Sequence, residues 1–420
     1  MNTQKKKPNE IIGTFALYPQ DEAYEYIVKE YPWAEDYTYY YIYVMYALRN
    51  SIIPTLNTIS EEDRQSYTPQ KAYAYIKAYE MSRLSFITII PTCNRPETIK
   101  FLLECAAPLY RRFAIDIVIY DSSSDNRTKE ITKEMVKKGY FNVIYKRYEG
   151  TFDGFSLDHK IMQAYDEYAD DYDYIWICRD GLVPVVDEIL DRVRYYKRKK
   201  IDCIIVDTRS RTEGLEVEQY YSSLDDCCNL LMDQATRLQT LGMLIFSGKF
   251  ARKLLKTQPV SDATYSLWQM AAPFHAFAAE PYHIVFCTKN VFSPNYYAST
   301  THFWGKAEKA LAQWAYRWYN VINSLPAVYD KAKKKCMMVY TVDFHPFTAR
   351  ALLEMRCYGG LTPTLLAKYD KYLLSVTKTP MWYIKTVAYL PKWLGRVVLW
   401  CDRKHPNLVH RIKNRIIRQK

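Results

Sequence analysis

Phe86-Ile-Thr-Ile-Ile-Pro-Thr-Cys-Asn-Arg-Pro96 is the stretch of sequence that decides the fold. Its first five residues are almost all apolar, which is typical of a strand buried on both faces. The polar residues that follow mark the end of this strand, and Pro96 suits the first turn of a helix, where no backbone N–H is needed. The stretch predicts a strand that passes directly into a helix, with free backbone N–H groups at the junction.

Six further apolar runs bounded by turn residues follow this first strand, and helical patterns separate the early ones. Apolar residues recur every three to four positions in Thr98–Ala107 and in Ser156–Ala169, as in helices that cover one face of a sheet. Strands that alternate with such helices predict an α/β fold with a mostly parallel sheet. The six runs are Ile115–Tyr120, Asn142–Tyr145, Tyr174–Cys178, Cys203–Val206, Met243–Phe246 and Ile284–Cys287.

Polar residues follow three of these predicted strands, at the sheet edge where open α/β folds bind ligands. They are Thr92 after the first strand, Asp121 after the second, and Arg179-Asp180-Gly181 after the fourth. A helix start beside the first of them favours phosphate, and a carboxylate after the fourth strand can bind a divalent ion on a diphosphate. The alternatives are a helix cap for Asp121 and a surface turn for Asp180.

The rest of the chain divides by pattern into two flanking regions. Residues 1–84 are predicted to form a helical, tyrosine-rich extension, residues 85–304 the sheet domain, and residues 305–420 a helical region. Ten cysteines without paired metal-ligand spacing, together with an N-terminus lacking a secretory signal, favour the reducing cytoplasm. The N-terminal extension is either a dimerisation element, which would make the protein a homo-oligomer, or a brace against the sheet.

The formal net charge of +12 is concentrated at the C-terminus. From Lys385 to Lys420 ten basic residues face one acidic residue, and the aromatic and basic residues of Met381–Cys401 interleave. This composition suits the headgroup layer of an anionic membrane, while no apolar stretch is long enough to span a bilayer. The alternatives are a solvated basic face packed on the main domain and an arm that binds nucleic acid. The rest of the chain is close to neutral in charge, which argues against a nucleic-acid groove over the whole protein.

Residues 85–290 resemble the family 2 inverting glycosyltransferases of the GT-A fold, a Rossmann-like sheet. The likeness rests on the order of Ile89-Ile90-Pro91-Thr92-x-Asn94-Arg95, the strand ending at Asp121, and the strand before Asp180. The resemblance implies a nucleotide-sugar donor along the first motif, with Asp121 at the edge of a uracil or thymine base. The implied donor-binding residues are Pro91, Thr92, Asn94, Arg95, Asp121, Ser123, Asp153, Asp158, Lys160, Arg179 and Asp180.

The implied metal motif departs from the family pattern. The family has Asp-x-Asp where this chain has Arg179-Asp180-Gly181. Either Asp180 alone holds Mg²⁺ or Mn²⁺, or Arg179 partly replaces the ion, or metal dependence is lost. His302 is a second candidate ligand, with ordinary packing as its alternative.

An inverting transfer also needs a base, because the acceptor hydroxyl loses its proton as it attacks the anomeric carbon. The resemblance points to Asp262, at a predicted helix start, and the alternative is a helix cap. The resulting hypothesis is sugar transfer from a UDP-sugar, or less favourably a dTDP-sugar, to a glycan acceptor on polyprenyl diphosphate. The sugar transfer would take place at the cytoplasmic face of the membrane, in bacterial cell-surface polysaccharide synthesis. The rivals are an inactive scaffold of the same fold and a nucleotidyltransferase, although the latter's glycine-rich phosphate loop is missing.

Overall fold

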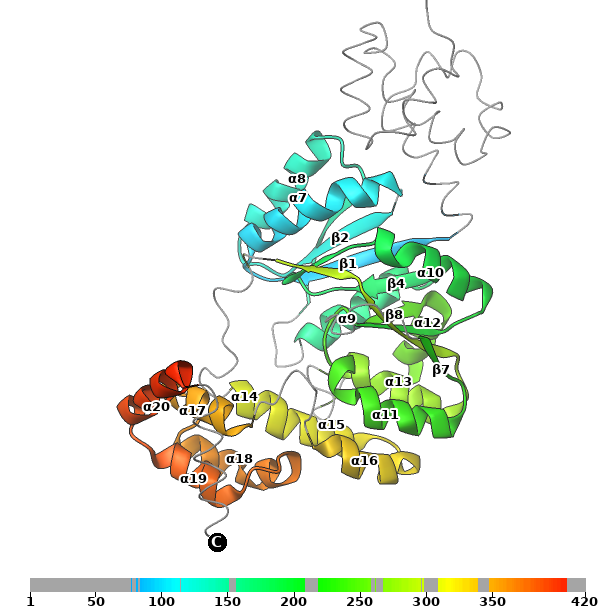
Figure 1. Cartoon of the computed structure of the whole chain (residues 1–420). Helices are drawn as coiled ribbons and strands as arrows, with labels where there is room; N and C mark the ends of the chain where they lie inside the picture. The colour runs from blue at the N-terminus through cyan, green and yellow to red at the C-terminus, as the bar shows by residue number, and fades with distance from the viewer. Residues whose placement is uncertain are drawn as a thin grey trace, which may run out of the picture.

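The computed structural model of the 420-residue chain describes Lys77, Met81 and residues 84–113, 115–150, 156–207, 218–257, 261, 267–295, 297, 309–338 and 347–405. Its centre is an eight-stranded sheet in the order β3-β2-β1-β4-β8-β6-β9-β7 (Figure 1). The strands are β1 (Phe86–Thr92), β2 (Asp116–Asp121), β3 (Val143–Arg147), β4 (Tyr174–Ile177), β6 (Cys203–Asp207), β7 (Glu218–Tyr221), β8 (Leu244–Ser247) and β9 (Ile284–Asn290).

The sheet is mixed but mostly parallel in its first half. β3, β2, β1 and β4 run parallel to one another, and so do β6 and β9. β8 is antiparallel to both of its neighbours, and β7 is antiparallel to β9 at the sheet edge. A small second sheet pairs β5 (Leu182–Pro184) with β10 (Phe292–Pro294). The predicted α/β class with a mostly parallel sheet is confirmed, and each of the seven predicted strands is present.

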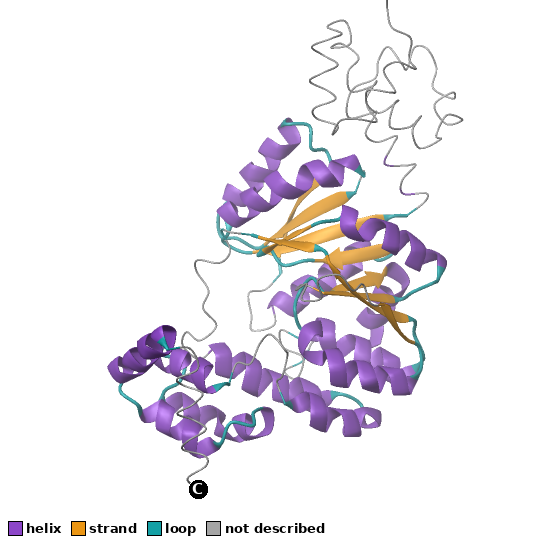
Figure 2. Ribbon diagram, in the orientation of Figure 1, coloured by secondary structure: helices purple, strands orange, loops and turns teal. Residues whose placement is uncertain are grey.

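Helices cover both faces of the sheet (Figure 2). Alternate residues of each strand feed two separate cores: Ile87 and Ile89 of β1 belong to one, whereas Phe86 and Ile90 belong to the other. The second core includes α7 (Pro96–Arg112), α8 (Arg127–Lys137) and α10 (Asp187–Arg198). The first includes α9 (Ser156–Tyr168), α11 (Leu224–Leu238), α12 (Gly248–Thr257) and α13 (Trp268–Ala279).

β1 owes its central place to its sequence. All seven of its residues are buried, as the apolar run predicted for a strand with neighbours on both sides. Pro96 stands at the start of α7, where its missing N–H costs nothing. The strand therefore passes into the helix within three residues, and Cys93, Asn94 and Arg95 are left at the carboxyl edge of the sheet.

The described part of the C-terminal region is helical, as predicted, and it extends the first core instead of forming one of its own. In the described residues, no helix is both long and apolar enough to traverse a bilayer. Residues 1–76 of the predicted N-terminal extension lie outside the described residues. The C-terminal helices are α14 (Lys309–Leu311), the π-helix η2 (Ala312–Arg317), α15 (Trp318–Ser324), the 3-10 helix η3 (Ala327–Tyr329), α16 (Asp330–Met337), α17 (Ala349–Tyr358), α18 (Pro363–Val376), α19 (Met381–Tyr389) and α20 (Lys392–Lys404).

Candidate functional site

The carboxyl ends of β2, β1 and β4 meet at one edge of the sheet because β1 lies between the other two. The register sets Thr92 beside Asp121 and Ile89 beside Ile177, so Asp180 follows β4 on the other side of Thr92. The Thr92 hydroxyl donates a 2.9 Å hydrogen bond to Asp180 Oδ2. Two of the three predicted strand ends are therefore joined directly by their side chains, and the third adjoins them through the strand pairing.

Asp180 is buried and accepts bonds at both of its carboxylate oxygens. Oδ2 accepts from Thr92, and Oδ1 accepts a 2.7 Å bond from Arg95 Nη1. Arg95 keeps 27% of its side chain exposed, so its charge reaches the solvent side of this pair. The Asn295 amide donates to the backbone oxygens of Thr98 and Asp180, at 2.9 and 3.1 Å, and so fixes the turn after β4 against α7. The adjoining Arg179 is exposed.

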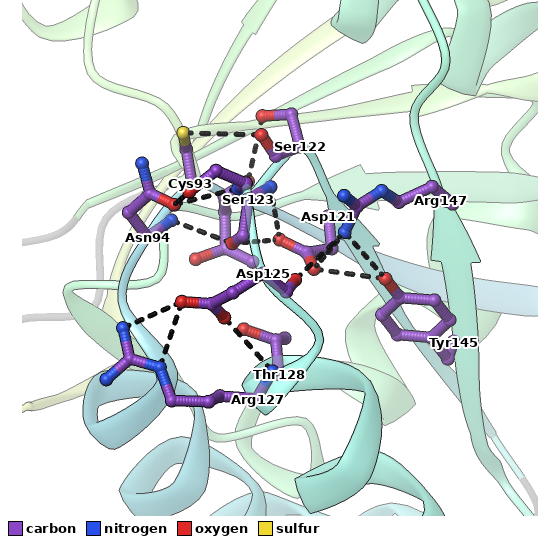
Figure 3. A network of polar contacts seen from close by, with 12 residues as sticks. Cys93, Asn94, Asp121, Ser122, Ser123, Asp125, Arg127, Thr128, Tyr145 and Arg147 are labelled. Atoms are coloured by element: carbon purple, nitrogen blue, oxygen red, sulfur yellow. Dashed lines mark hydrogen bonds and ion pairs between the residues drawn. The ribbon is translucent and has the colours of Figure 1, made fainter.

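Asp121 is fully buried and organises the loops around it (Figure 3). Its Oδ1 accepts from both the backbone N–H, at 2.9 Å, and the hydroxyl of Ser123. Its Oδ2 accepts from the Tyr145 hydroxyl at 3.1 Å and from Arg147 Nη1 at 3.4 Å. Four donors from the protein itself therefore bond to the two carboxylate oxygens of Asp121 in this structure. The predicted contact to a nucleotide base stays a prediction.

Asn94 ties the loop after β1 to the loop after β2 (Figure 3). Its φ of 54° is in the left-handed region, which asparagine tolerates better than most residues. From there its backbone N–H donates to the Ser123 hydroxyl at 2.7 Å, and its Oδ1 accepts from the backbone N–H and the hydroxyl of Ser124. Asp125 accepts a 3.0 Å bond from the backbone N–H of Arg127, the first residue of α8.

Lys160 reaches this edge from α9 and is almost completely buried there. Its ammonium group donates to the Thr92 backbone oxygen at 2.7 Å and to the Ser122 hydroxyl at 3.0 Å, which joins β1 to the loop after β2. Burial lowers its pKa to about 8, an effect that the nearby Asp121 and Asp180 carboxylates oppose. Lys160 is therefore mostly protonated at neutral pH, but it loses its proton at a lower pH than an exposed lysine does.

This lowered pKa predicts a specific pH dependence of stability. Between pH 8 and pH 10.5 the unfolded chain binds the proton of Lys160 more strongly than the folded chain does, so folding becomes more favourable as pH rises through this window. Relative to Lys160→Met, the wild-type free energy of unfolding should rise by about 1 kcal/mol per pH unit there. Urea unfolding at several pH values measures it, with the exposed Lys137→Met as control. Parallel profiles of the wild type and Lys160→Met would contradict the prediction.

The remaining predicted site residues are Pro91 and Asp158, which the structure describes, and three residues that it does not. Pro91 is buried within β1, beside Tyr120. Asp158 is buried on α9, and its Oδ1 accepts a 3.4 Å bond from the backbone N–H of Trp268, the first residue of α13. This bond caps the start of a helix other than its own. Asp153, Asp262 and His302 lie outside the described residues, and their predicted roles stay predictions.

A divalent ion at this edge would have to take most of its ligands from substrate and water. Within the described ranges, no three histidine, cysteine, aspartate or glutamate side chains gather into a group suited to a metal ion. Asp180 alone offers a carboxylate at the end of β4, and Mg²⁺ is commonly held in proteins by one or two carboxylates together with substrate phosphates. Arg95 already occupies Oδ1, so an ion and Arg95 would have to share Asp180.

A cavity of about 440 Å³ lies at the opposite, amino-terminal edge of the parallel strands. Ser85 before β1, Tyr174 at the start of β4 and Asp202 before β6 line it. This cavity is separate from the site at the carboxyl edge, and its lining mixes aspartates with lysines.

Three residues of the carboxyl edge were missed by the sequence reasoning. Tyr145 and Arg147 reach Asp121 from the end of β3, and Asn295 holds the turn of Asp180 from beyond β9. Tyr145 and Arg147 had a usable signal, because Tyr145 ends a predicted strand and Arg147 follows two residues later, which places both on one face of the extended chain. Asn295 had none, since it is distant in sequence and follows an unpredicted strand, β10.

The fold and the site together define an α/β protein with a polar, cation-rich site at the carboxyl edge of a mostly parallel sheet. Within it, residues 87–156 match the family model described as Glycosyl transferase family 2. The matched segment begins in β1 and ends at the first residue of α9, and it contains Thr92 and Asp121 but not Asp180.

Solved structures with a similar arrangement are distant in sequence, and no curated protein matches the chain. Residues 1–349 of TarS from S. aureus are 11% identical, with a TM-score of 0.39, over 76% of this chain and 92% of that one. The mannosyltransferase PcManGT from Pyrobaculum calidifontis, solved in complex with GDP-Man and Mn²⁺, is 14% identical, with a TM-score of 0.42, over 79% and 97%.

Proposed function

We propose that this protein is a glycosyltransferase that uses a nucleotide-activated sugar. The observation that carries the proposal is the bonded set of Thr92, Arg95 and Asp180 at the carboxyl edge of the sheet, since β2, β3 and nearly all of β1 lie within the match to the glycosyl transferase family 2 model. Arg95, Lys160 and Arg147 bring three cations to this edge against the carboxylates of Asp121 and Asp180. A diphosphate is the natural ligand for such an edge, because it adds negative charge where cations and helix N–H groups collect.

The proposed donor is a UDP-sugar, and the proposed reaction is an inverting displacement. The acceptor oxygen forms a bond to the anomeric carbon as the bond from that carbon to the diphosphate oxygen breaks, and the diphosphate leaves with the electron pair. The acceptor proton passes to a base, for which Asp262 is the candidate. A bound Mg²⁺ or Mn²⁺, held by Asp180, would supply charge neutralisation for the leaving diphosphate. Arg95 and Lys160 supply positive charge from the protein itself, and Thr92 orients Asp180.

The proposed acceptor is a glycan carried on polyprenyl diphosphate at the cytoplasmic face of a bacterial membrane, in cell-surface polysaccharide synthesis. The support for this setting is the basic, aromatic C-terminal segment, which suits an anionic leaflet.

A thermal-shift panel tests the donor class. UDP, dTDP and GDP, free and as sugar conjugates, should be compared with and without Mn²⁺, and UDP-linked ligands are expected to raise the melting temperature by several degrees at saturation. Asp262→Asn should keep this shift and lose both transfer and slow donor hydrolysis. Failure of every nucleotide to stabilise the wild type would refute the proposal.

An inactive scaffold of the same fold is the second candidate, and the Arg179-Asp180-Gly181 sequence favours it because only one carboxylate remains. The same panel separates the two. If nucleotide-sugars bind the wild type but none is ever turned over, with or without acceptor, the scaffold function replaces the enzymatic one.

A further inference from the structure

One side of α20 exposes large apolar residues to solvent. Trp393, Val397 and Trp400 are exposed to 66%, 47% and 56%. They are four and three residues apart, a spacing that places them on a single face of a helix. A row of three exposed apolar side chains on a surface helix is a candidate site for an interaction.

The opposite side of α20 is fixed to the protein, so the exposed face is presented in a definite orientation. Gly395 packs so closely on α17 that a methyl group at its position would lie 2.9 Å from Cys357 Sγ. Asp402, the one acidic residue of α20, is buried, and its Oδ2 accepts a 3.2 Å bond from Nη1 of Arg350 on α17. Because this carboxylate points inward, the exposed side of α20 carries no negative side chain.

Basic residues border the apolar row. Lys392, Arg396, Arg403 and Lys404 are all exposed, and the Lys404 ammonium group lies 4.0 Å from the centre of the Trp400 ring. With 100° between successive residues, Lys404 falls in line with the apolar row, whereas the other three lie together along one flank. The exposed face therefore combines tryptophan, an aliphatic residue and four positive charges.

This combination is the chemistry of the membrane–water interface. Tryptophan is favoured at the headgroup level because its ring is apolar and its N–H is polar. Lysine and arginine side chains gain from the negative potential of an anionic leaflet. A protein partner would need an apolar groove lined with acids, whereas a bilayer of anionic lipids offers both properties to any helix that lies flat on it.

We propose that the exposed face of α20 binds an anionic lipid bilayer, with Trp393 and Trp400 entering the headgroup layer. The sequence prediction covered all of Met381–Cys401, whereas this proposal is limited to α20. Tyr383, Ile384 and Val387 of α19 are buried in the protein core and so are not free to contact lipid. The proposal concerns attachment alone and does not depend on sugar transfer. Nucleotide binding in solution, measured without vesicles, tests the proposed function separately.

Vesicle co-sedimentation of the full chain tests the tryptophan pair. With vesicles of phosphatidylcholine and phosphatidylglycerol at 3:1, Trp393→Ala/Trp400→Ala should lower the partition coefficient at least tenfold. Tyr220→Ala, which removes an exposed aromatic ring from the edge strand β7, is the matched control and should bind as the wild type does. Unchanged circular dichroism and melting temperature would show that the double variant is folded.

Charge reversal tests the electrostatic contribution to vesicle binding. Arg396→Glu/Arg403→Glu should weaken binding more than tenfold, because each basic residue near an anionic surface contributes about fivefold. Lys137→Glu/Lys256→Glu carries the same change in net charge on two exposed lysines of the sheet domain and should reduce binding much less. Vesicles of phosphatidylcholine alone should bind the wild type weakly, and added salt should release it from the anionic vesicles.

Quenching of tryptophan fluorescence by brominated lipid gives a readout of position. The wild type should be quenched on anionic vesicles, and Trp393→Ala/Trp400→Ala should lose most of that quenching. The proposal is overturned if the tryptophan variant binds and is quenched like the wild type, if the wild type ignores anionic vesicles, or if it binds a short RNA more tightly than vesicles at equal salt. Binding that survives the tryptophan changes but is lost on deletion of residues 406–420 also overturns it.

Discussion

Replacing Asp180 with asparagine is expected to lower kcat/KM for sugar transfer by about a hundredfold to a thousandfold. The change removes the charge that orients Arg95 through a 2.7 Å ion pair and the carboxylate available to a divalent ion. Both consequences weaken the stabilisation of charge on the departing diphosphate. Steady-state kinetics with a saturating acceptor measures the effect, and nucleotide binding by calorimetry separates lost affinity from lost turnover.

Asp191→Asn provides the control for this change. Asp191 is an acidic residue of α10 whose side chain is 91% exposed and whose partner, Arg194, lies one helical turn away. Its replacement should leave kcat/KM within about twofold, because surface ion pairs contribute little. Thr92→Ala, which removes only the 2.9 Å bond to Asp180, should give an intermediate loss. If Asp180→Asn retained full activity, the role assigned to this edge of the sheet would be wrong.

Trp176→Ala should have the largest effect on stability, with a loss of about 3–5 kcal/mol in the free energy of unfolding. Trp176 lies on β4 with no exposed surface, and its ring packs 5.2 Å from that of Phe292 and 6.2 Å from that of Phe86. Its indole N–H donates a 2.7 Å bond to the Gly242 backbone oxygen, which alanine would leave without this donor. Urea unfolding, followed by circular dichroism, gives the value.

Trp176→Phe separates packing from hydrogen bonding at this site. It keeps most of the ring contacts and loses the bond to Gly242, so its cost should be well below that of alanine, at about 1–2 kcal/mol. Equal losses for the two variants would show that the hydrogen bond outweighs the packing. A loss below 1 kcal/mol for Trp176→Ala would contradict the burial of this ring.

Except for the edge strand β3, the strands that the sequence predicted are buried on both faces. β1 and β4 are mostly apolar over their whole length, which is typical of strands buried on both faces. β7 was missed because Glu218-Gln-Tyr-Tyr221 is an edge strand with three exposed residues and has no such run. The antiparallel direction of β8 could not be predicted either, because apolar spacing reports burial and not the direction of the chain.

The site was predicted best where its residues directly follow a strand. Thr92 and Asp180 emerge at one edge because parallel neighbours end together, and this follows from sequence order once the sheet is assumed. Lys160 was predicted at the same edge, but its burial and its bond to the Thr92 backbone depend on how α9 packs, which no local pattern encodes. Contacts such as that between Asp158 and Trp268 are 110 residues apart in sequence and are likewise decided by packing.

The loop at Asn94 has a consequence for the kinetics and thermodynamics of ligand capture. The Asn94 backbone N–H is bonded to Ser123 and its side-chain oxygen to Ser124, so the loop is already ordered before a ligand arrives. Binding to a loop that is already ordered avoids the loss of conformational entropy that ordering a flexible loop would cost. We therefore expect ligand association to show no slow phase from loop rearrangement. The change in heat capacity on binding should match the surface that the ligand itself buries, with no added contribution from ordering of the loop.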